Sequence, residues 1–167
     1  YDNDGDLDHF ATFSNTNFLS KNNGDGGFTV FSIMDIVLNH NTPITSNPSS
    51  SLADIDNDGF LDHLLLKVGN NLLLHNNGDG TFTEIVDGVI INDMENSMSC
   101  SWGDYDNNGY LDLFVINWNQ NNTLYKNNGG VFEKITGDVT VSNYDNLEEG
   151  CYSHSSSWGD YDNDGFL

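Results

Sequence analysis

Four short segments of the chain place aspartates on alternate residues and follow them with a glycine. These segments are residues 1–8 (YDNDGDLD), 54–62 (DIDNDGFLD), 104–112 (DYDNNGYLD) and 160–167 (DYDNDGFL). Carboxylates placed this close together repel one another unless a cation lies between them. A hard divalent ion with six to eight oxygen ligands relieves the repulsion, and calcium suits a flexible carboxylate cage better than magnesium does. The segments therefore predict calcium-binding loops.

The second and third segments contain the complete pattern D-x-D-x-[DN]-G-x-x-D. The ligands expected in the second loop are the side chains of Asp54, Asp56, Asp58 and Asp62 and the carbonyl group of Phe60. Those expected in the third loop are the side chains of Asp104, Asp106, Asn108 and Asp112 and the carbonyl group of Tyr110. Asn108 keeps an oxygen ligand but lacks the charge of Asp58, so we expect the third site to be weaker.

The two outer segments contain only part of the pattern. The candidate ligands are Asp2, Asp4, Asp6 and Asp8 in the first loop, and Asp160, Asp162 and Asp164 in the last. The first segment lacks the position of the first ligand and the last lacks the ninth, so we count two complete calcium sites and two partial ones. This register suggests a fragment of a larger propeller, or a repeat polymer in which copies meet end to end and complete the split loops.

Two other interpretations of the acidic segments are weaker. An EF-hand needs a glutamate at the twelfth position and a helix on each side. Leu65 and Val115 occupy that position, and the residues around them are β-rich. Simple Asp/Asn/Gly turns are the second interpretation, because these residues favour turns without any metal. Four occurrences in the same register favour calcium over turns alone.

The elements that position the loops follow from a repeat. The third residue of the pattern is Asp2, Asp56, Asp106 and Asp162, so the spacings are 54, 50 and 56 residues. Within one period we expect four short strands, at 99–105, 111–118, 122–126 and 131–135. The last two flank an Asn-Asn-Gly turn, a strong hairpin signal because Asn and Gly tolerate positive φ.

Four strands in about 50 residues match one propeller blade, and a blade must pack against its neighbours to bury both faces. The predicted fold is therefore all-β, with about three four-stranded β-propeller-type blades. Residues 1–167 form one repeat array. Its approximate units are 1–53, 54–103 and 104–159, and a further unit starts at 160–167.

The composition excludes several classes of partner. The formal net charge is −22, with four lysines and no arginine. Nucleic acids and anionic membrane surfaces need clustered basic residues, so neither is an expected partner. No apolar run approaches the ~18–20 residues that span a bilayer, which argues against membrane insertion. Cys100 and Cys151 leave two alternatives open, a disulfide in an oxidising compartment or two buried thiols.

No catalytic residue is predicted. The five histidines lack partners at metal-binding spacing, and the serine runs at 49–51 and 155–157 have no nucleophile elbow nearby. Trp102 and Trp158 recur just before a loop and are expected to pack between blades. Trp118 has no counterpart in the other repeats, so it is the best candidate for a sugar-stacking platform, although core packing also explains it.

Three blocks carry a resemblance to a known family: residues 102–115 (WGDYDNNGYLDLFV), 157–167 (SWGDYDNDGFL) and 76–82 (NNGDGTF). They resemble VCBS/FG-GAP repeats, the blades of integrin-α-like β-propellers that are common in large secreted bacterial proteins. The resemblance implies calcium in a loop between the first two strands of each blade, and an extracellular or cell-surface location.

The functional expectation is a non-catalytic, calcium-binding structural or adhesive module. The expected partners are calcium and either other copies of the chain or the rest of a larger propeller, together with glycans or cell-surface proteins. A lectin-like carbohydrate binder and an accessory domain of a secreted polysaccharide-active enzyme are the alternatives, because the family itself implies no single activity.

Overall fold

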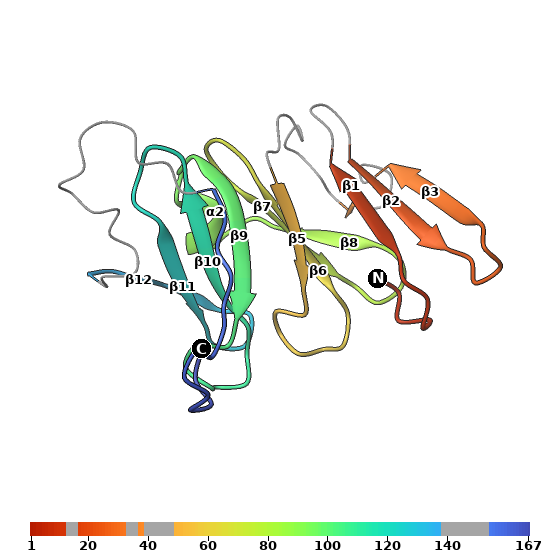
Figure 1. Ribbon diagram of the computed structural model, residues 1–167. Helices are drawn as coiled ribbons and strands as arrows, with labels where there is room; N and C mark the ends of the chain where they lie inside the picture. Colours follow the sequence, from red (N-terminus) through yellow and green to blue (C-terminus); the bar gives the residue numbers. More distant parts are fainter. Residues whose placement is uncertain (13–16, 33–36, 39–48, 138–153) are drawn as a thin grey trace.

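A computed structural model describes residues 1–12, 17–32, 37–38, 49–137 and 154–167, and they form three β-sheets (Figure 1). The first sheet has the strand order β1-β2-β3, the second β4-β8-β7-β6-β5 and the third β12-β11-β10-β9. The first sheet contains β1 (His9–Thr12), β2 (Asn17–Asn22) and β3 (Phe28–Ser32). The second contains β4 (Val37–Leu38), β5 (Ser49–Ala53), β6 (Asp62–Leu66), β7 (Leu72–Asn76) and β8 (Phe82–Ile85). The third contains β9 (Ser97–Gly103), β10 (Asp112–Asn117), β11 (Thr123–Asn127) and β12 (Phe132–Ile135).

The predicted all-β fold of propeller-like blades is confirmed. In the third sheet the four expected strands are present, with ends that shift by no more than two residues. The Asn-Gly turns close the hairpins as expected: Gly78 and Gly129 both have a φ of 73°, a conformation that glycine adopts without steric cost. The local turn chemistry therefore sets the hairpin register, in which Asn76 pairs with Phe82 and Asn127 with Phe132.

The strand count differs from the expected four in two of the sheets. The described part of the first sheet has three strands, and the second has four antiparallel strands plus the two-residue β4. β4 follows the first sheet in sequence but pairs parallel to β8, with Val37 opposite Phe82. The first unit, residues 1–53, therefore contributes both β4 and β5 to the second sheet, one at each edge. The second and third acidic loops lie between the first two strands of their sheets, so a unit counted from the loop contains parts of two sheets.

The middle sheet is buried on both faces. All five residues of β6 are buried, and alternate side chains join different apolar clusters. Leu64 and Leu66 pack with Leu113 and Val115 of the third sheet, whereas Leu65 packs toward the first sheet. Stacked sheets that share their cores in this way are what a repeat needs when one unit cannot bury its own faces.

A single-turn helix, α2 (Val89–Asn92), and a short loop connect the second and third sheets. Lys134 of β12 forms ion pairs with Asp93 and Glu95 of this loop, and its Nζ lies 2.7 and 2.8 Å from their carboxylate oxygens. The stacked sheets place all of the acidic loops along the lower edge of the molecule in Figure 1, where both chain ends also lie. No helix in the described part of the chain has the length and apolar character needed to cross a membrane.

Candidate metal centre

The four acidic loops share one backbone conformation. The fourth residue of the pattern is an asparagine in the left-handed region: φ is 59° at Asn3, 62° at Asn57, 55° at Asn107 and 59° at Asn163. The glycine two residues later has a φ between 91° and 95° in every loop. Asparagine and glycine are the residues that tolerate these values, so the sequence itself folds the loop back on itself.

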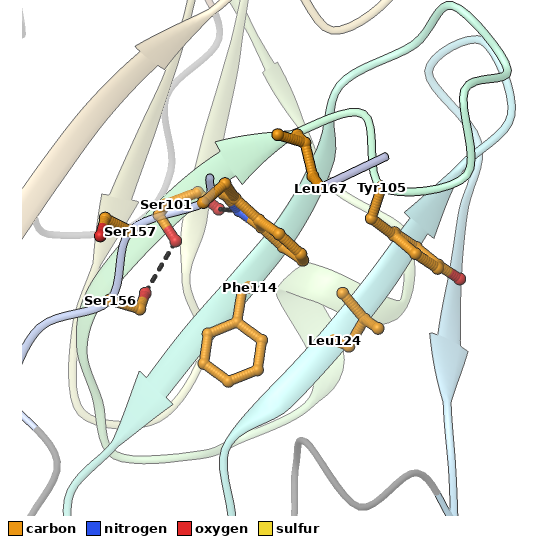
Figure 2. Close-up of a pocket in the computed structure, with 8 residues that line it drawn as sticks. Ser101, Tyr105, Phe114, Leu124, Ser156, Ser157 and Leu167 are labelled. Carbon is orange, nitrogen blue, oxygen red and sulfur yellow. Dashed lines mark hydrogen bonds between the residues drawn. The ribbon is translucent and has the colours of Figure 1, made fainter. Parts of the chain in front are cut away.

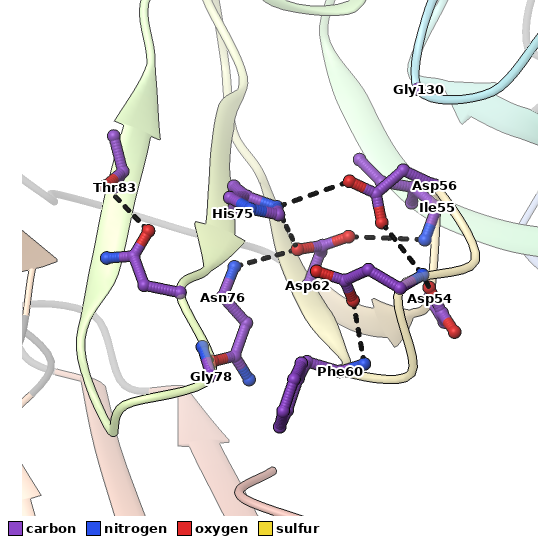
Figure 3. Close-up of polar contacts among 12 residues, drawn as sticks. Asp54, Ile55, Asp56, Phe60, Asp62, His75, Asn76, Gly78, Thr83 and Gly130 are labelled. Carbon is purple, nitrogen blue, oxygen red and sulfur yellow. Dashed lines mark hydrogen bonds and ion pairs between the residues drawn. The ribbon is translucent and has the colours of Figure 1, made fainter.

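The first aspartate of each complete loop caps the turn with both carboxylate oxygens. Asp54, which Figure 3 labels beside Asp56 and Asp62, accepts hydrogen bonds from the amides of Asp58 and Gly59, each at 3.0 Å. Asp104 accepts the equivalent bonds from Asn108 and Gly109, at 2.9 and 2.8 Å. These carboxylates are therefore fixed facing the inside of the loop before any cation arrives.

The ninth aspartate attaches each complete loop to its sheet through hydrogen bonds to backbone amides. Asp62 is 1% exposed and accepts the amides of Ile55, at 3.2 Å, and of Asn76, at 2.8 Å. Asp112 is fully buried and accepts the equivalent amides of Tyr105 and Asn127. Burial raises the pKa of both carboxyl groups above the usual range, against the opposing effect of the hydrogen bonds.

The carboxylates of three loops lie close together. Three sets each have ligand atoms within 4.8 Å of one another: Asp54, Asp56 and Asp58; Asp104, Asp106 and Asp112; and Asp160, Asp162 and Asp164. Such dense sets of oxygen donors fit a hard divalent cation, because the ion removes the mutual repulsion of the charges. Asp62 belongs to a further set, with Asp56 and His75. The carbonyl ligands Phe60 and Tyr110 stay predictions. The side-chain oxygen of Asn108 accepts a hydrogen bond from the backbone amide of Tyr110 at 2.8 Å.

The first loop lacks the first aspartate of the pattern, but its ninth aspartate makes the same contact with the sheet. Lys21 pairs with Asp2 and lies 3.3 Å from Asp4, and Asp8 accepts the amide of Asn22 at 2.8 Å. Asp6 is exposed, and its amide bonds to Asp4 at 3.0 Å. One carboxylate oxygen of Asp2 is buried without a hydrogen-bond partner, so it is free to coordinate a cation.

Sequence reasoning missed the basic residue beside three of the four loops. Lys21, His75 and Lys126 each stand just before the asparagine that ends a strand. Lys126 pairs with Asp106, and His75 Nδ1 lies 3.0 Å from Asp62 Oδ1 and 3.7 Å from Asp56 Oδ2. The signal was visible as KNNG, HNNG and KNNG, but only the hairpin register shows that this residue faces the aspartates.

A second missed feature links successive loops. The side-chain amide of Asn57 donates to the carbonyl of Gly109 in the next loop at 2.8 Å, and Asn107 donates to the carbonyl of Gly165 at 3.0 Å. We call these two bonds the inter-loop contacts. They fix the spacing of the candidate sites along the edge.

The tryptophans before the loops pack between repeats, as expected. Trp102 donates to Ser51 Oγ of the second sheet at 3.1 Å. Trp158 stacks on Tyr105, with 6.1 Å between the ring centroids. Trp158 also helps to line the pocket shown in Figure 2. A Cβ atom on Gly103 would lie 2.6 Å from the ring of Trp158, which explains the glycine at this position.

The other candidates have more ordinary surroundings. Trp118 is 39% exposed and meets His154 edge-on at 6.3 Å, so part of its ring is covered. Burial raises the pKa of the Cys100 thiol to about 11, and its predicted alternative partner, Cys151, lies outside the described residues. Neither residue belongs to a described set of carboxylate ligands.

Comparison with known proteins agrees with the geometry. No match was found among curated proteins. A family model for the FG-GAP-like repeat matches three times, at residues 1–65, 54–115 and 104–167, and together these matches cover the whole chain. Successive matches overlap at the second and third acidic loops, so each of these two loops belongs both to the end of one copy and to the start of the next. The chain therefore belongs to the FG-GAP-like repeat family, with three copies of the repeat along its length.

Proposed function

We propose that the chain is a non-catalytic, calcium-stabilised repeat scaffold of a secreted or cell-surface protein, in which each acidic loop holds one calcium ion. The observation that carries this proposal is the set of pre-folded loops, in which backbone amides aim the first and ninth aspartates at a dense group of carboxylates. Asp54, Asp56, Asp58 and Asp62 would hold one ion, and Asp104, Asp106, Asn108 and Asp112 another.

The ion would supply positive charge where the chain has very little. Four lysines face 26 acidic residues, so self-repulsion opposes folding. Because the ligand set exists only in the folded chain, binding free energy adds directly to stability. Extracellular calcium modules bind calcium with dissociation constants of ~0.1–1 mM. An affinity in this range would let the calcium outside cells fill the loops, which is why the proposal places the chain in a secreted or cell-surface protein with a structural or adhesive role.

Thermal unfolding with saturating calcium and then with excess chelator tests the proposal. If two sites each see calcium at about ten times their dissociation constant, they add ~3 kcal/mol of stability together. That corresponds to a loss of roughly 6–12 °C in Tm on chelation for a chain of this size. Circular dichroism at 218 nm would follow the loss of strand structure.

A double variant with Asp56→Asn and Asp106→Asn is the matched control, because it keeps the shape of both loops but removes one charge from each. Its Tm should respond to calcium much less than that of the wild type. An equal Tm with calcium and with chelator in the wild type would contradict the proposal and leave the loops as metal-free turns.

A further inference from the structure

A pocket lies between the second and third sheets, next to the helix α2. Its lining includes the buried side chains of Leu73, Ile90 and Ile91 and the partly buried side chains of Ile85 and Phe132. The volume is about 260 Å³. An apolar cavity of about 150 Å³ holds a benzene ring, whereas small-molecule sites usually measure about 300–1,000 Å³. The pocket therefore has the size of one or two aliphatic side chains.

The exposed part of the lining is also apolar. Val131 lines the pocket and is 70% exposed, and Val89 of α2 lines it and is 40% exposed. Val131 takes the place of Thr81 in the second hairpin and of Gly27 in the first, directly before the phenylalanine that begins the outer strand. Apolar side chains that gather around a pocket mark an interaction site, unlike single exposed residues.

The third hairpin turn has also lost the charge that its counterparts carry. The turn at 127–132 is one residue shorter than the turns at 22–28 and 76–82. Each of the longer turns contains an aspartate, Asp25 or Asp79, whose carboxylate accepts a hydrogen bond from a turn amide. No acidic residue is present at 127–132. The hairpin turn beside this pocket is therefore the uncharged one.

The charged group in the lining is acidic. Asp87 accepts hydrogen bonds from the amide of Gly88 at 2.9 Å and from the side chain of Asn92 at 3.1 Å. It forms no ion pair with any described residue, and Lys134 of β12 is already paired with the loop that follows α2. The net charge of the chain is −22. A carboxylate without a counter-ion beside an apolar pocket favours a partner that carries positive charge.

The second sheet shows that the outer edge of this architecture accepts a short aliphatic strand. There, Val37 and Leu38 form β4, which pairs parallel to β8 with Val37 opposite Phe82. β12 is the counterpart of β8, and among the described residues no strand pairs with its outer edge. Phe132, which begins β12, also lines the pocket. An extended segment can therefore pair with β12 as β4 pairs with β8, with a side chain beside Phe132.

We propose that this pocket and the adjoining edge of β12 bind an extended segment of a partner protein in which aliphatic residues are flanked by lysine or arginine. The main chain of the segment pairs with β12, an aliphatic side chain fills the pocket, and a basic neighbour forms an ion pair with Asp87. None of these contacts uses an acidic loop, so the inference goes beyond the calcium-binding proposal and does not depend on it.

Two-dimensional NMR of the full chain, titrated with the peptide acetyl-Lys-Val-Leu-Lys-amide, tests the proposal. The amides of Gly88, Gly130 and Val131 report on the pocket, because these residues line it. We expect their shifts to saturate with a dissociation constant of about 1 mM, the scale that burial of one or two aliphatic side chains supports. Acetyl-Lys-Asn-Gln-Lys-amide lacks the aliphatic residues and acetyl-Glu-Val-Leu-Glu-amide reverses the charge, so each should bind at least about fivefold more weakly.

Two variants test the lining and the charge separately. Val131→Thr introduces the residue type of the second hairpin, and the loss of one apolar methyl group should weaken binding of the lysine peptide about fourfold. Asp87→Asn keeps the oxygen that accepts the Gly88 amide and should weaken binding about two- to fivefold at low salt. The matched control is Val68→Thr, because Val68 is 69% exposed but does not line the pocket. It should leave the affinity within about twofold of the wild type.

Three outcomes would overturn the proposal. The first is the absence of a saturable shift at the three reporting amides with up to about 10 mM lysine peptide. The second is an equal effect of Val131→Thr and Val68→Thr, or equal binding of the lysine and glutamate peptides, since the lining or the charge would then play no part. The third is a shift of the same amides with protein concentration alone, which would show that a second copy of the chain occupies the edge instead.

Discussion

The residue that follows the ninth aspartate differs in its surroundings from one sheet to another. His63 of β6 is fully buried, and neither ring nitrogen has a hydrogen-bond partner. Its ring lies 4.3 Å from that of Phe10, and burial lowers its pKa to about 3. Leu113 occupies the equivalent position of the third sheet and is also buried. An apolar side chain therefore fits this place in the repeat, and the histidine leaves two buried polar atoms unsatisfied.

His63→Leu should stabilise the chain by about 1–3 kcal/mol at pH 7, because it removes an unsatisfied buried polar group. The gain should grow as pH falls below about 6.5. His63 binds a proton there in the unfolded wild type, whereas in the folded state its pKa is about 3 and it stays neutral. Urea unfolding at pH 7 and pH 5 measures both effects.

The matched control is His9→Leu, which changes an exposed residue at the same position of the first sheet and should alter stability by less than about 0.5 kcal/mol. A destabilised His63→Leu protein would show instead that the imidazole packs better than leucine can.

Whole strands are tied to the preceding repeat by buried asparagines. Asn127, the last residue of β11, is fully buried, and its side-chain amide donates to the carbonyls of Ile55 at 2.7 Å and Leu111 at 3.0 Å. Asn76 of β7 makes the equivalent bonds, to Tyr1 and Leu61. One side chain at the end of a strand thus joins two acidic loops, its own and the one before.

Asn127→Ala should destabilise the chain by about 2–4 kcal/mol, because two buried carbonyl groups lose their donor. The neighbouring Asn128 is exposed, so Asn128→Ala removes the same atoms from the same turn and should cost less than about 0.5 kcal/mol. Urea unfolding of the two variants makes the comparison, and equal stabilities would mean that the inter-repeat bonds of Asn127 contribute nothing.

At this scale the sequence predicts what is local. The Asn-Gly turns and apolar runs define the hairpins of the third sheet, and the alternating aspartates define the loops. Contacts between repeats could not be predicted in the same way. The pairing of β4 with β8 joins residues 37 and 82, and the partner of Asn57 lies in the following loop. Such contacts depend on how the sheets stack, which no short pattern encodes.

The whole molecule concentrates its charge on one edge. The net charge is −22, and the acidic loops lie side by side there while the two stacked cores lie between the sheets. Repulsion along this edge opposes stacking, and the apolar contacts of the middle sheet favour it. The balance between the two should depend on anything that screens or neutralises the loops.

We expect the Tm of the calcium-free chain to rise by several degrees when potassium chloride is raised from about 20 to 500 mM, because the Debye length falls from roughly 20 to 4 Å. With saturating calcium the rise should be smaller, since the ions already neutralise the loops. Calorimetry in both conditions tests this, and a calcium-free Tm that is insensitive to salt would contradict it.

The inter-loop contacts also bear on how such a chain can change length. The second and third loops donate through their fourth residue, and the third and fourth loops accept through their glycine carbonyl, so the third loop has a donor on one side and an acceptor on the other. Duplicating or deleting one whole copy keeps each donating asparagine next to an accepting glycine carbonyl. A break inside a copy leaves one donor and one acceptor without a partner. Genetic insertions and losses in this array should therefore be tolerated in steps of about 50 residues.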